Sequence, residues 1–307
     1  MKLIATLLIL VTALLAGCAA PAAVAPAQQA PAAPGLARSE ALVDTAWVAE
    51  NLNRAGVRLV DVSSKAEVYA EGHIPGAVYL AVGSALVNPD DPVKGQVATA
   101  AQVEALLGRL GIDNQTTIVL YDDTNSLYAA RAFWALRYYG HQAVRILDGG
   151  RKKWVAEGRK LSQETPSVTA TTYKAGKPDL AIRATWEQVL AALDQSGKTL
   201  VDARGPKEYT GQDVRSARGG HIPGAINLDL TSQVNPDGTF KPVAELLQMY
   251  EQAGVKPDQT AITYCQTGVR AAHSWFVLSQ LLGFANVANY DGSWEEWGNR
   301  TDLPIKR

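Results

Sequence analysis

The stretch Thr260-Ala261-Ile262-Thr263-Tyr264-Cys265-Gln266-Thr267-Gly268-Val269-Arg270 joins a strand-like run to a helix-like run at 271–282. Strand, short loop and helix in this order form the repeating unit of α/β proteins. Cys265 stands at the junction, where a helix presents unpaired main-chain N–H groups and its positive dipole end. Both favour a thiolate over a thiol, so the sequence predicts a reactive cysteine here.

Size and composition limit the possible functions. The chain has 307 residues, enough for about two domains. Its 29 Lys and Arg residues nearly balance 30 Asp and Glu residues, and no basic stripe is present, so we do not expect a nucleic-acid partner. The four histidines show no metal-ligand spacing with one another or with cysteine, and we expect neither a metal nor a cofactor. They are His73, His141, His221 and His273.

The N-terminus has the pattern of an export signal. Lys2 precedes an apolar run at 3–14 that is shorter than the roughly 20 residues of a membrane span, which predicts a signal peptide over 1–17. Leu15-Ala16-Gly17-Cys18 resembles the lipobox of bacterial lipoproteins. That resemblance implies a lipid on Cys18 and a protein exported and anchored to a bacterial membrane. The alternative is an ordinary signal peptide cut at a later alanine, which would release an exported soluble protein.

Lipidation would use one of only two cysteines, leaving Cys265 as a free thiol without a disulfide partner in the chain. Residues 19–34 are mostly Ala and Pro, so we expect 18–38 to be a semi-extended tether.

After the tether the chain repeats itself in order and approximate spacing. We therefore expect a first domain at 39–165, a linker at 166–180 and a second domain at 181–307. The matching segments are Leu59-Val60-Asp61-Val62 with Leu200-Val201-Asp202-Ala203, Gly72-His73-Ile74-Pro75-Gly76-Ala77 with Gly220-His221-Ile222-Pro223-Gly224-Ala225, Ile118-Val119-Leu120-Tyr121 with Ala261-Ile262-Thr263-Tyr264, and Asp148-Gly149-Gly150 and Trp154 with Asp291-Gly292-Ser293 and Trp297.

Each copy alternates strand and helix signals, which predicts an α/β fold with a mainly parallel sheet flanked by helices. In the first copy we expect strands at 57–62, 77–80, 116–121 and 143–147, and helices at 43–54, 101–110 and 129–139. In the second we expect strands at 199–201, 261–264 and 286–288, and helices at 186–193, 243–252 and 271–282.

The copies differ where chemistry is expected. The first has Asp122 where the second has Cys265, and its loop is one residue longer before the helix. Functional loops gather at the carboxyl ends of parallel strands. We infer one active site, in the second domain, with the first domain as scaffold and one wall of the cleft.

Together these motifs resemble the rhodanese family, specifically its two-domain sulfurtransferases, over about 39–300. The resemblance implies two tandem rhodanese-like domains, the first inactive and the second catalytic. It also implies a double displacement, in which Cys265 takes the outer sulfur of thiosulfate as a persulfide and passes it to a nucleophilic acceptor, cyanide or a thiol.

The loop itself supports a small anion site. Four residues separate Cys265 from Arg270, and their main-chain N–H groups can form a nest for one sulfur atom. Related cysteine phosphatases have five residues there, so we disfavour a phosphatase. Arg270 is our candidate for binding the anionic donor. Gln266, Thr267, Gly268 and Val269 shape the nest, and Gly268 is expected to need φ above zero.

Several assignments remain open at this level. Well-known thiosulfate enzymes of the family have two cations after the cysteine, whereas this chain has Gln266 and Thr267, so 3-mercaptopyruvate is an alternative donor and a persulfide carrier an alternative function. Arg204 is a further substrate-binding candidate, because the first copy has Ser63 there. His73 and His221 occur in both copies, which favours structural roles. Substrate contacts by His221, Asp202 or Tyr121 are left undecided.

Overall fold

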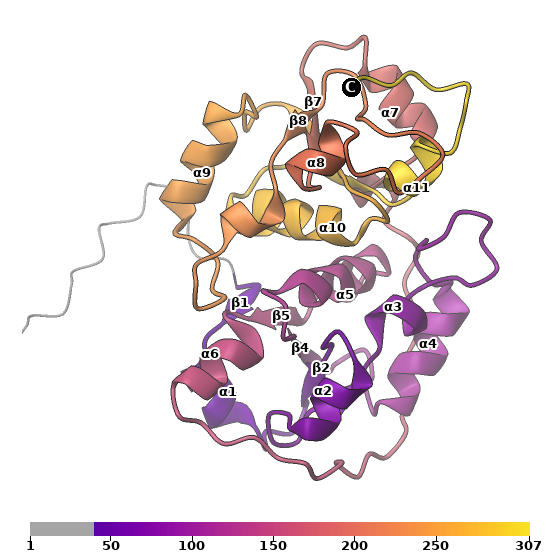
Figure 1. Ribbon diagram of the computed structural model, residues 1–307. Coiled ribbons are helices and arrows are strands. Elements are labelled where there is room, and N and C mark those ends of the chain that lie inside the picture. Colours follow the sequence, from indigo (N-terminus) through magenta and orange to yellow (C-terminus); the bar gives the residue numbers. More distant parts are fainter. Residues whose placement is uncertain (1–39) are drawn as a thin grey trace, which may run out of the picture. The chain divides into compact units, whose positions relative to one another are not determined.

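The structure, a computed structural model, describes residues 40–307, in which each copy forms a five-stranded parallel sheet with helices around it (Figure 1). The strand order is β1-β5-β4-β2-β3 in the first sheet and β6-β10-β9-β7-β8 in the second. Each strand thus has a counterpart at the same place in the other sheet, and all strand pairs in both sheets are parallel. The predicted α/β class and duplication are confirmed.

The first copy contains the predicted strands and helices with small shifts at their ends, and four further elements that were not predicted: β1, α2, α3 and α6. Its elements are β1 (Leu42–Val43), α1 (Thr45–Asn51), β2 (Val57–Asp61), α2 (Ala66–Glu71), β3 (Val78–Tyr79), α3 (Val82–Ala85), α4 (Ala100–Arg109), β4 (Thr117–Tyr121), α5 (Leu127–Tyr138), β5 (Val144–Leu147) and α6 (Gly150–Ala156).

The second copy repeats this order. Its elements are the 3₁₀-helix η1 (Leu180–Ile182), β6 (Arg183–Ala184), α7 (Trp186–Ala192), β7 (Lys198–Asp202), α8 (Pro206–Tyr209), β8 (Ile226–Asn227), the 3₁₀-helix η2 (Leu230–Gln233), α9 (Val243–Gln252), β9 (Thr260–Tyr264), α10 (Val269–Phe276), the π-helix η3 (Val277–Leu281), β10 (Val287–Tyr290) and α11 (Ser293–Trp297).

Local sequence explains most element ends. Thr99 and Thr185 begin α4 and α7 through capping boxes with Gln102 and Gln188, which satisfy N–H groups of the first helical turn. The helix predicted at 271–282 begins earlier, at Val269, and its end is the π-helix η3. Edge strands β1, β6 and β8 escape prediction because a two-residue strand shows no hydrophobic period.

The two copies share one apolar core where α5 and α10 lie side by side (Figure 1). The ring of Phe133 on α5 meets that of Phe276 edge to face, with 4.9 Å between centroids. Both side chains are almost completely buried. Because α10 follows Cys265 directly, the first copy supports the helix on which the expected active site depends.

Between α6 and η1, residues 157–179 form neither a helix nor a named strand, and the predicted linker at 166–180 falls largely within this stretch. It packs on the first copy, where buried Tyr173 contacts His141 with 3.3 Å between the hydroxyl oxygen and Nδ1. Within residues 40–307, none of the helices has the length and apolar character needed to span a membrane. The predicted signal peptide, Cys18 and the tether at 18–38 lie outside the described residues.

Candidate active site

Cys265 is the first residue after β9, at the carboxyl end of the strand, and α10 begins four residues later. We call residues 265–270 the Cys265 loop. Gly268, the last residue before α10, has φ +75°, which confirms the expected left-handed conformation. A Cβ atom there would lie 2.8 Å from Oδ1 and 2.9 Å from the carbonyl oxygen of Asp291. Both the positive φ and these close contacts therefore require glycine.

Four hydrogen bonds fasten the main chain of the Cys265 loop to residues 293–295. Trp294 N–H donates to the carbonyl of Cys265 at 2.9 Å, and Glu295 N–H donates to that of Gln266 at 2.8 Å. The N–H groups of Cys265 and Gly268 both donate to Oγ of Ser293, at 3.1 and 3.0 Å. This fixes the shape of the loop from the side of α11.

Four other loop N–H groups find no acceptor among residues 40–307; they belong to Gln266, Thr267, Val269 and Arg270. An unpaired main-chain donor is costly unless water or a ligand satisfies it. Successive free N–H groups at a helix start form an anion site. The predicted nest is therefore available for an anionic sulfur species.

Cys265 is the only cysteine in the described part of the chain, and its thiol is free. Its side chain packs with Ala203 and Ala271, and the residue is 1% exposed. Small apolar neighbours leave this sulfur without competing polar side chains on that side. The low exposure also means that a donor reaches the sulfur through a narrow opening or after nearby side chains move.

Arg270 forms a bidentate ion pair with Glu208 on α8, with nitrogen–oxygen distances of 2.5 and 2.8 Å. Burial lowers the pKa of the Arg270 guanidinium, but Glu208 outweighs burial and the charge of nearby Cys265 adds to this, so the pKa is raised. Burial raises the pKa of Glu208, but Arg270, Arg215 and Arg204 together lower it more, and the net pKa is lowered. Arg270, the predicted donor-binding cation, thus lies within electrostatic range of the Cys265 thiol, but its guanidinium is already paired with the Glu208 carboxylate.

Arg215 extends this pair. Its guanidinium lies 3.6 Å from Glu208 and is half exposed. Arg215 also binds Asp213, with a shortest distance of 2.6 Å, so the two guanidinium groups near the Cys265 loop are balanced by two carboxylates.

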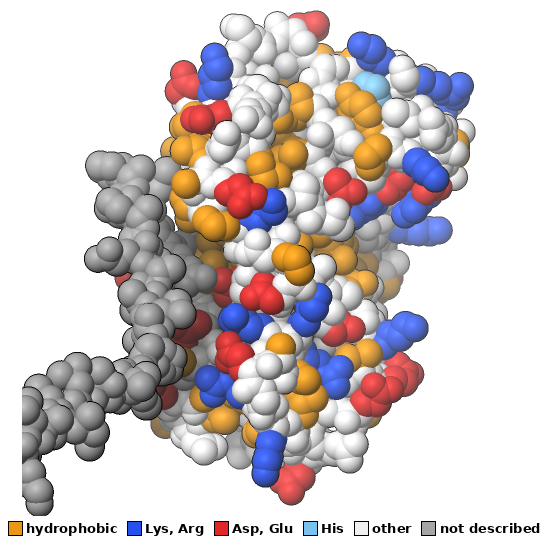
Figure 2. All heavy atoms as spheres, turned by 60° about the vertical axis from the view of Figure 1, so that its left-hand side comes forward, with side chains coloured by type: hydrophobic (Ala, Val, Ile, Leu, Met, Phe, Trp, Pro, Cys, Tyr) orange, Lys and Arg blue, Asp and Glu red, His pale blue; other side chains and the backbone are white. Residues whose placement is uncertain are grey.

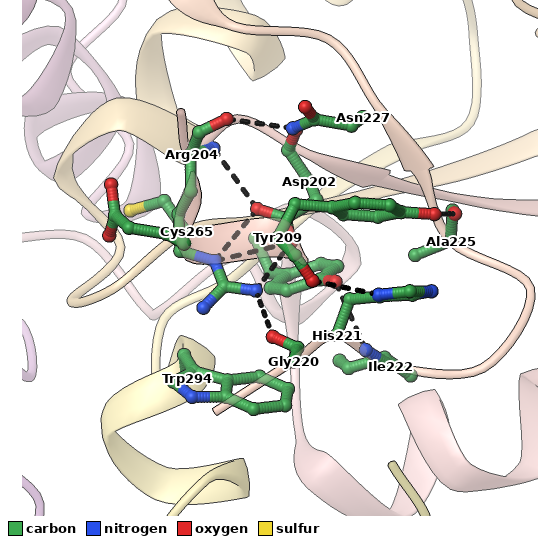
Figure 3. Close-up of polar contacts among 12 residues, drawn as sticks. Asp202, Arg204, Tyr209, Gly220, His221, Ile222, Ala225, Asn227, Cys265 and Trp294 are labelled. Carbon is green, nitrogen blue, oxygen red and sulfur yellow. Dashed lines mark hydrogen bonds and ion pairs between the residues drawn. The ribbon is translucent and has the colours of Figure 1, made fainter. Parts of the chain in front are cut away.

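Arg204 is placed differently from expectation (Figure 3). Its Nε and one terminal nitrogen bind the Asp202 carboxylate, with a shortest distance of 2.6 Å, and the same terminal nitrogen donates to the carbonyl of Gly220 at 2.8 Å. The guanidinium also lies 4.5 Å from the centre of the Trp294 ring and is 1% exposed. These contacts make Arg204 and Asp202 a buried support beneath the site, and a substrate contact by either stays a prediction.

The two turn histidines have matching structural environments. His221 stacks on Tyr209 at 3.7 Å with its Nδ1 2.9 Å from the carbonyl of that tyrosine, and His73 stacks on Tyr69 at 3.9 Å in the same way. This supports the structural interpretation of both. Tyr121 is completely buried, and its hydroxyl accepts the main-chain N–H of Ile74.

The first copy reaches the Cys265 loop through α5 and through the segment before α4. Arg131 on α5 pairs with Asp291 at 2.6 Å, donates to the carbonyl of Gly95 at 2.8 Å and lies 3.5 Å from that of Gly268. A Cβ on Gly95 would come within 3.1 Å of the Thr267 side chain. The first copy therefore forms part of the wall around the loop.

Gln266, the residue after the cysteine, is held in place by side chains of the second copy. Its Nε2 donates to Ser216 Oγ at 3.0 Å and to Glu295 at 3.3 Å.

Figure 2 shows positive and negative side chains mixed over the visible face of the molecule. No group of three His, Cys, Asp or Glu side chains in 40–307 is placed to hold a metal ion.

Sequence reasoning missed four residues of the site: Glu208, Ser293, Asp291 and Arg131. A signal existed for two of them, Asp291 and Ser293, since Asp291-Gly292-Ser293 matches Asp148-Gly149-Gly150 except that serine replaces the last glycine. The others gave no local signal, because their contacts join segments far apart in the chain.

Comparison with known proteins identifies the class of protein. The rhodanese-like domain matches the chain twice, at 44–157 and 185–300, and the chain belongs to this family as two tandem rhodanese domains. It is a sulfurtransferase of the rhodanese type.

Particular relatives narrow the comparison. A thiosulfate sulfurtransferase by name from Saccharopolyspora erythraea is 43% identical over 279 residues, 88% of this chain and 98% of the relative. A protein of Thermus thermophilus named sulfur carrier protein TtuD is also 43% identical, over 89% of this chain and 99% of its own.

Solved structures agree on the fold. The anaerobic ergothioneine biosynthesis enzyme from Chlorobium limicola, in complex with trimethyl histidine, gives a TM-score of 0.78 at 26% identity, with 87% of this chain and 70% of that chain covered. A structure of EanB, whose cysteine carries a persulfide, superposes equally well at 25% identity over the same shares of the two chains.

Proposed function

We propose that the protein moves the outer sulfur of thiosulfate to a nucleophilic acceptor through a persulfide on Cys265. The observation that carries this proposal is the row of main-chain N–H groups that have no acceptor within residues 40–307, beside a free cysteine at a helix start. The names of the relatives point to the same donor. The cysteine persulfide of the EanB structure supports this form of intermediate.

Two displacements complete the cycle. The Cys265 thiolate attacks the outer sulfur of thiosulfate, the sulfur–sulfur bond of the donor breaks, and sulfite leaves with the bonding electrons. The outer sulfur remains on Cys265 as a persulfide, with its negative charge facing the loop N–H groups and the positive end of α10. Cyanide then attacks this outer sulfur, thiocyanate leaves, and the thiolate returns; a thiol acceptor would leave as a persulfide.

The names of the relatives, rather than the exposure of Cys265, favour thiosulfate over 3-mercaptopyruvate. Only 1% of Cys265 is exposed, and the ring between Cys265 and Arg270 has four intervening residues. Thiosulfate and 3-mercaptopyruvate each present a single terminal sulfur atom to such an opening, and the anionic part of either donor would lie near Arg270. 3-Mercaptopyruvate is the second candidate donor, because Thr267 could take the place of the serine found after the cysteine in enzymes that use it.

A persulfide carrier without rapid turnover is the candidate of another class. The Thermus relative supports it by name, at the same identity as the thiosulfate sulfurtransferase. Steady-state assays with cyanide separate the possibilities, because a carrier takes up one sulfur and then turns over slowly with either donor.

The decisive experiment is the intact mass of the purified protein after incubation with thiosulfate and removal of excess donor. We expect a gain of one sulfur atom on the peptide that contains Cys265, and its loss after cyanide is added. A Cys265→Ser variant is the control and should neither gain mass nor turn over. Turnover retained by this variant would remove Cys265 from the mechanism.

We also propose that Cys18 carries the lipid that anchors the mature chain to a bacterial membrane. The support is the sequence of 1–18 alone. In a bacterial expression host, the protein should enter the detergent phase of a Triton X-114 separation, and a Cys18→Ala variant should not. An unlipidated mature N-terminus in the wild-type protein would contradict the proposal.

A further inference from the structure

Ser293, the first residue of α11, has a main-chain conformation that serine seldom adopts. Its φ is +50°, in the left-handed region, and the residue is completely buried. Non-glycine residues are held in this region only where surrounding contacts compensate, and such residues gather at functional sites. At the equivalent place in the first copy, the chain has Gly150 with φ +52°, which carries no such strain.

The equivalence of Ser293 and Gly150 rests on hydrogen bonds as well as on sequence. Trp294 N–H donates to the carbonyl of Cys265, and Arg151 N–H donates to the carbonyl of Asp122 at 3.0 Å. The active copy therefore keeps a strained serine where the inactive copy has glycine.

The hydroxyl of Ser293 uses its full hydrogen-bonding capacity within the protein. It donates to the carbonyl of Tyr290 at 2.7 Å and accepts the N–H groups of Cys265 and Gly268 at 3.1 and 3.0 Å. A hydroxyl has one donor and two acceptor positions, so nothing is left for a substrate. Its contacts are made to the first residue of the Cys265 loop and to the last residue before the helix.

In the first copy another group satisfies the corresponding N–H. Ser126, the last residue before α5, also has a left-handed conformation, and its N–H donates to the carboxylate of Asp122 at 2.9 Å. The side chain at the cysteine position thus closes the loop in the inactive copy. In the active copy Ser293 closes it from behind, which releases the side chain of Cys265 from that task.

We propose that Ser293 is a positioning residue: its hydroxyl holds the N–H groups of Cys265 and Gly268, so that the loop keeps its remaining N–H groups free for an anion beside the sulfur. This inference rests on the proposed function, because it concerns the same persulfide site. Without the hydroxyl, two buried N–H groups lose their acceptor, and the loop relaxes to find another. Small displacements of such a site slow chemistry strongly.

Two substitutions of Ser293 separate this role from a purely structural one. Ser293→Ala removes the hydroxyl and keeps the strain, whereas Ser293→Gly removes both and provides a second, relaxed variant. For thiosulfate and cyanide we expect kcat to fall about 10- to 100-fold in both variants, with KM changed less than about threefold. Ser279→Ala is the matched control, since that partly buried serine donates to the carbonyl of Trp275 away from the loop, and its kcat should stay within about twofold of wild type.

Each outcome decides the question. A kcat within twofold of wild type in either folded variant, a change confined to KM, or unfolding of both variants would overturn the positioning role. If the wild-type protein itself does not turn over thiosulfate, the proposed function fails instead. The rate of Cys265 alkylation by iodoacetamide then still tests Ser293, and it should fall about tenfold in both variants.

Discussion

The loop after β4 and the loop after β9 occupy the same place in their sheets but hold different charges. In the first copy, the buried carboxylate of Asp122 accepts main-chain N–H groups of its own loop and helix start, from Thr124, Ser126, Tyr128 and Ala129, at 2.8 to 3.0 Å. In the second copy, the N–H groups of Gln266, Thr267, Val269 and Arg270 have no acceptor in the described chain. The fold thus builds an anion nest twice, and only one copy leaves it open.

A second difference lies beneath the two loops. Asp202 in the second copy pairs with Arg204, whereas Asp61 in the first faces Ser63, and burial raises the pKa of Asp61 despite hydrogen bonds from Ser63 and Tyr121. The segment between the stacked tyrosine and histidine is also longer in the second copy, at 210–220 against 70–72. Ser216 of this longer segment holds Gln266, so the second copy has additional support around its loop.

The first copy is expected to support the Cys265 loop, and replacing Arg131 tests whether it does. Arg131→Met would leave the buried carboxylate of Asp291 without its main partner, so we expect the free energy of unfolding to fall by about 3–5 kcal/mol. Because the same guanidinium lies by Gly268 and Gly95, kcat should also fall, by about tenfold. Urea denaturation and steady-state kinetics measure the two effects.

Arg137→Met is the matched control for this experiment. Arg137 lies on the same helix and donates to the carbonyl of Gln142 at 3.4 Å. Its replacement should change the free energy of unfolding by about 1 kcal/mol or less and leave kcat unchanged. If Arg131→Met left kcat unchanged, as Arg137→Met should, the Cys265 loop would not depend on this contact with the first copy.

The pH dependence of stability tests whether the Asp122 carboxylate fills the anion nest of the first copy. Burial raises the pKa of Asp122 to about 6, against the four N–H groups, which lower it. The native state then binds more protons than the unfolded chain between about pH 4 and pH 6. The free energy of unfolding should therefore fall as pH rises through this window, by up to about 3 kcal/mol, and stay constant above it.

Asp122→Asn should lack this slope, and urea denaturation at several values between pH 4 and pH 7 compares the two proteins. Its kcat at pH 7 should stay within about twofold of wild type, because the residue lies outside the active copy. If wild-type stability instead rises with pH relative to the variant, the N–H groups prevail over burial and the nest prefers the charged form.

Local patterns in the sequence predicted the features that the two copies share. The strand, cysteine, loop and helix order, the duplication and the positive φ of Gly268 could be predicted because each depends on residues close together in the chain. The partner of Arg270 lies 62 positions away and that of Arg131 lies 160 positions away. With a single sequence, nothing indicates which carboxylate meets which guanidinium, so the donor-binding role given to Arg270 could not include Glu208.

The smallest expected effect concerns the cation at the mouth of the nest. If Arg270 binds the anionic donor, Arg270→Ala should raise the KM for thiosulfate about tenfold, equivalent to about 1.4 kcal/mol. Glu208→Gln should lower KM about two- to threefold, since it removes the carboxylate that competes with the donor for the guanidinium.

The double variant decides between two explanations of such changes. If Glu208 acts by neutralising Arg270, then Glu208→Gln should have little effect on KM once Arg270 is alanine, because there is no guanidinium left to release. If instead Glu208→Gln lowers KM equally in both backgrounds, the carboxylate repels the donor directly and does not act through Arg270. An Arg270→Ala variant with unchanged KM would exclude Arg270 from donor binding, and the open nest would then hold its anion with main-chain N–H groups and without Arg270.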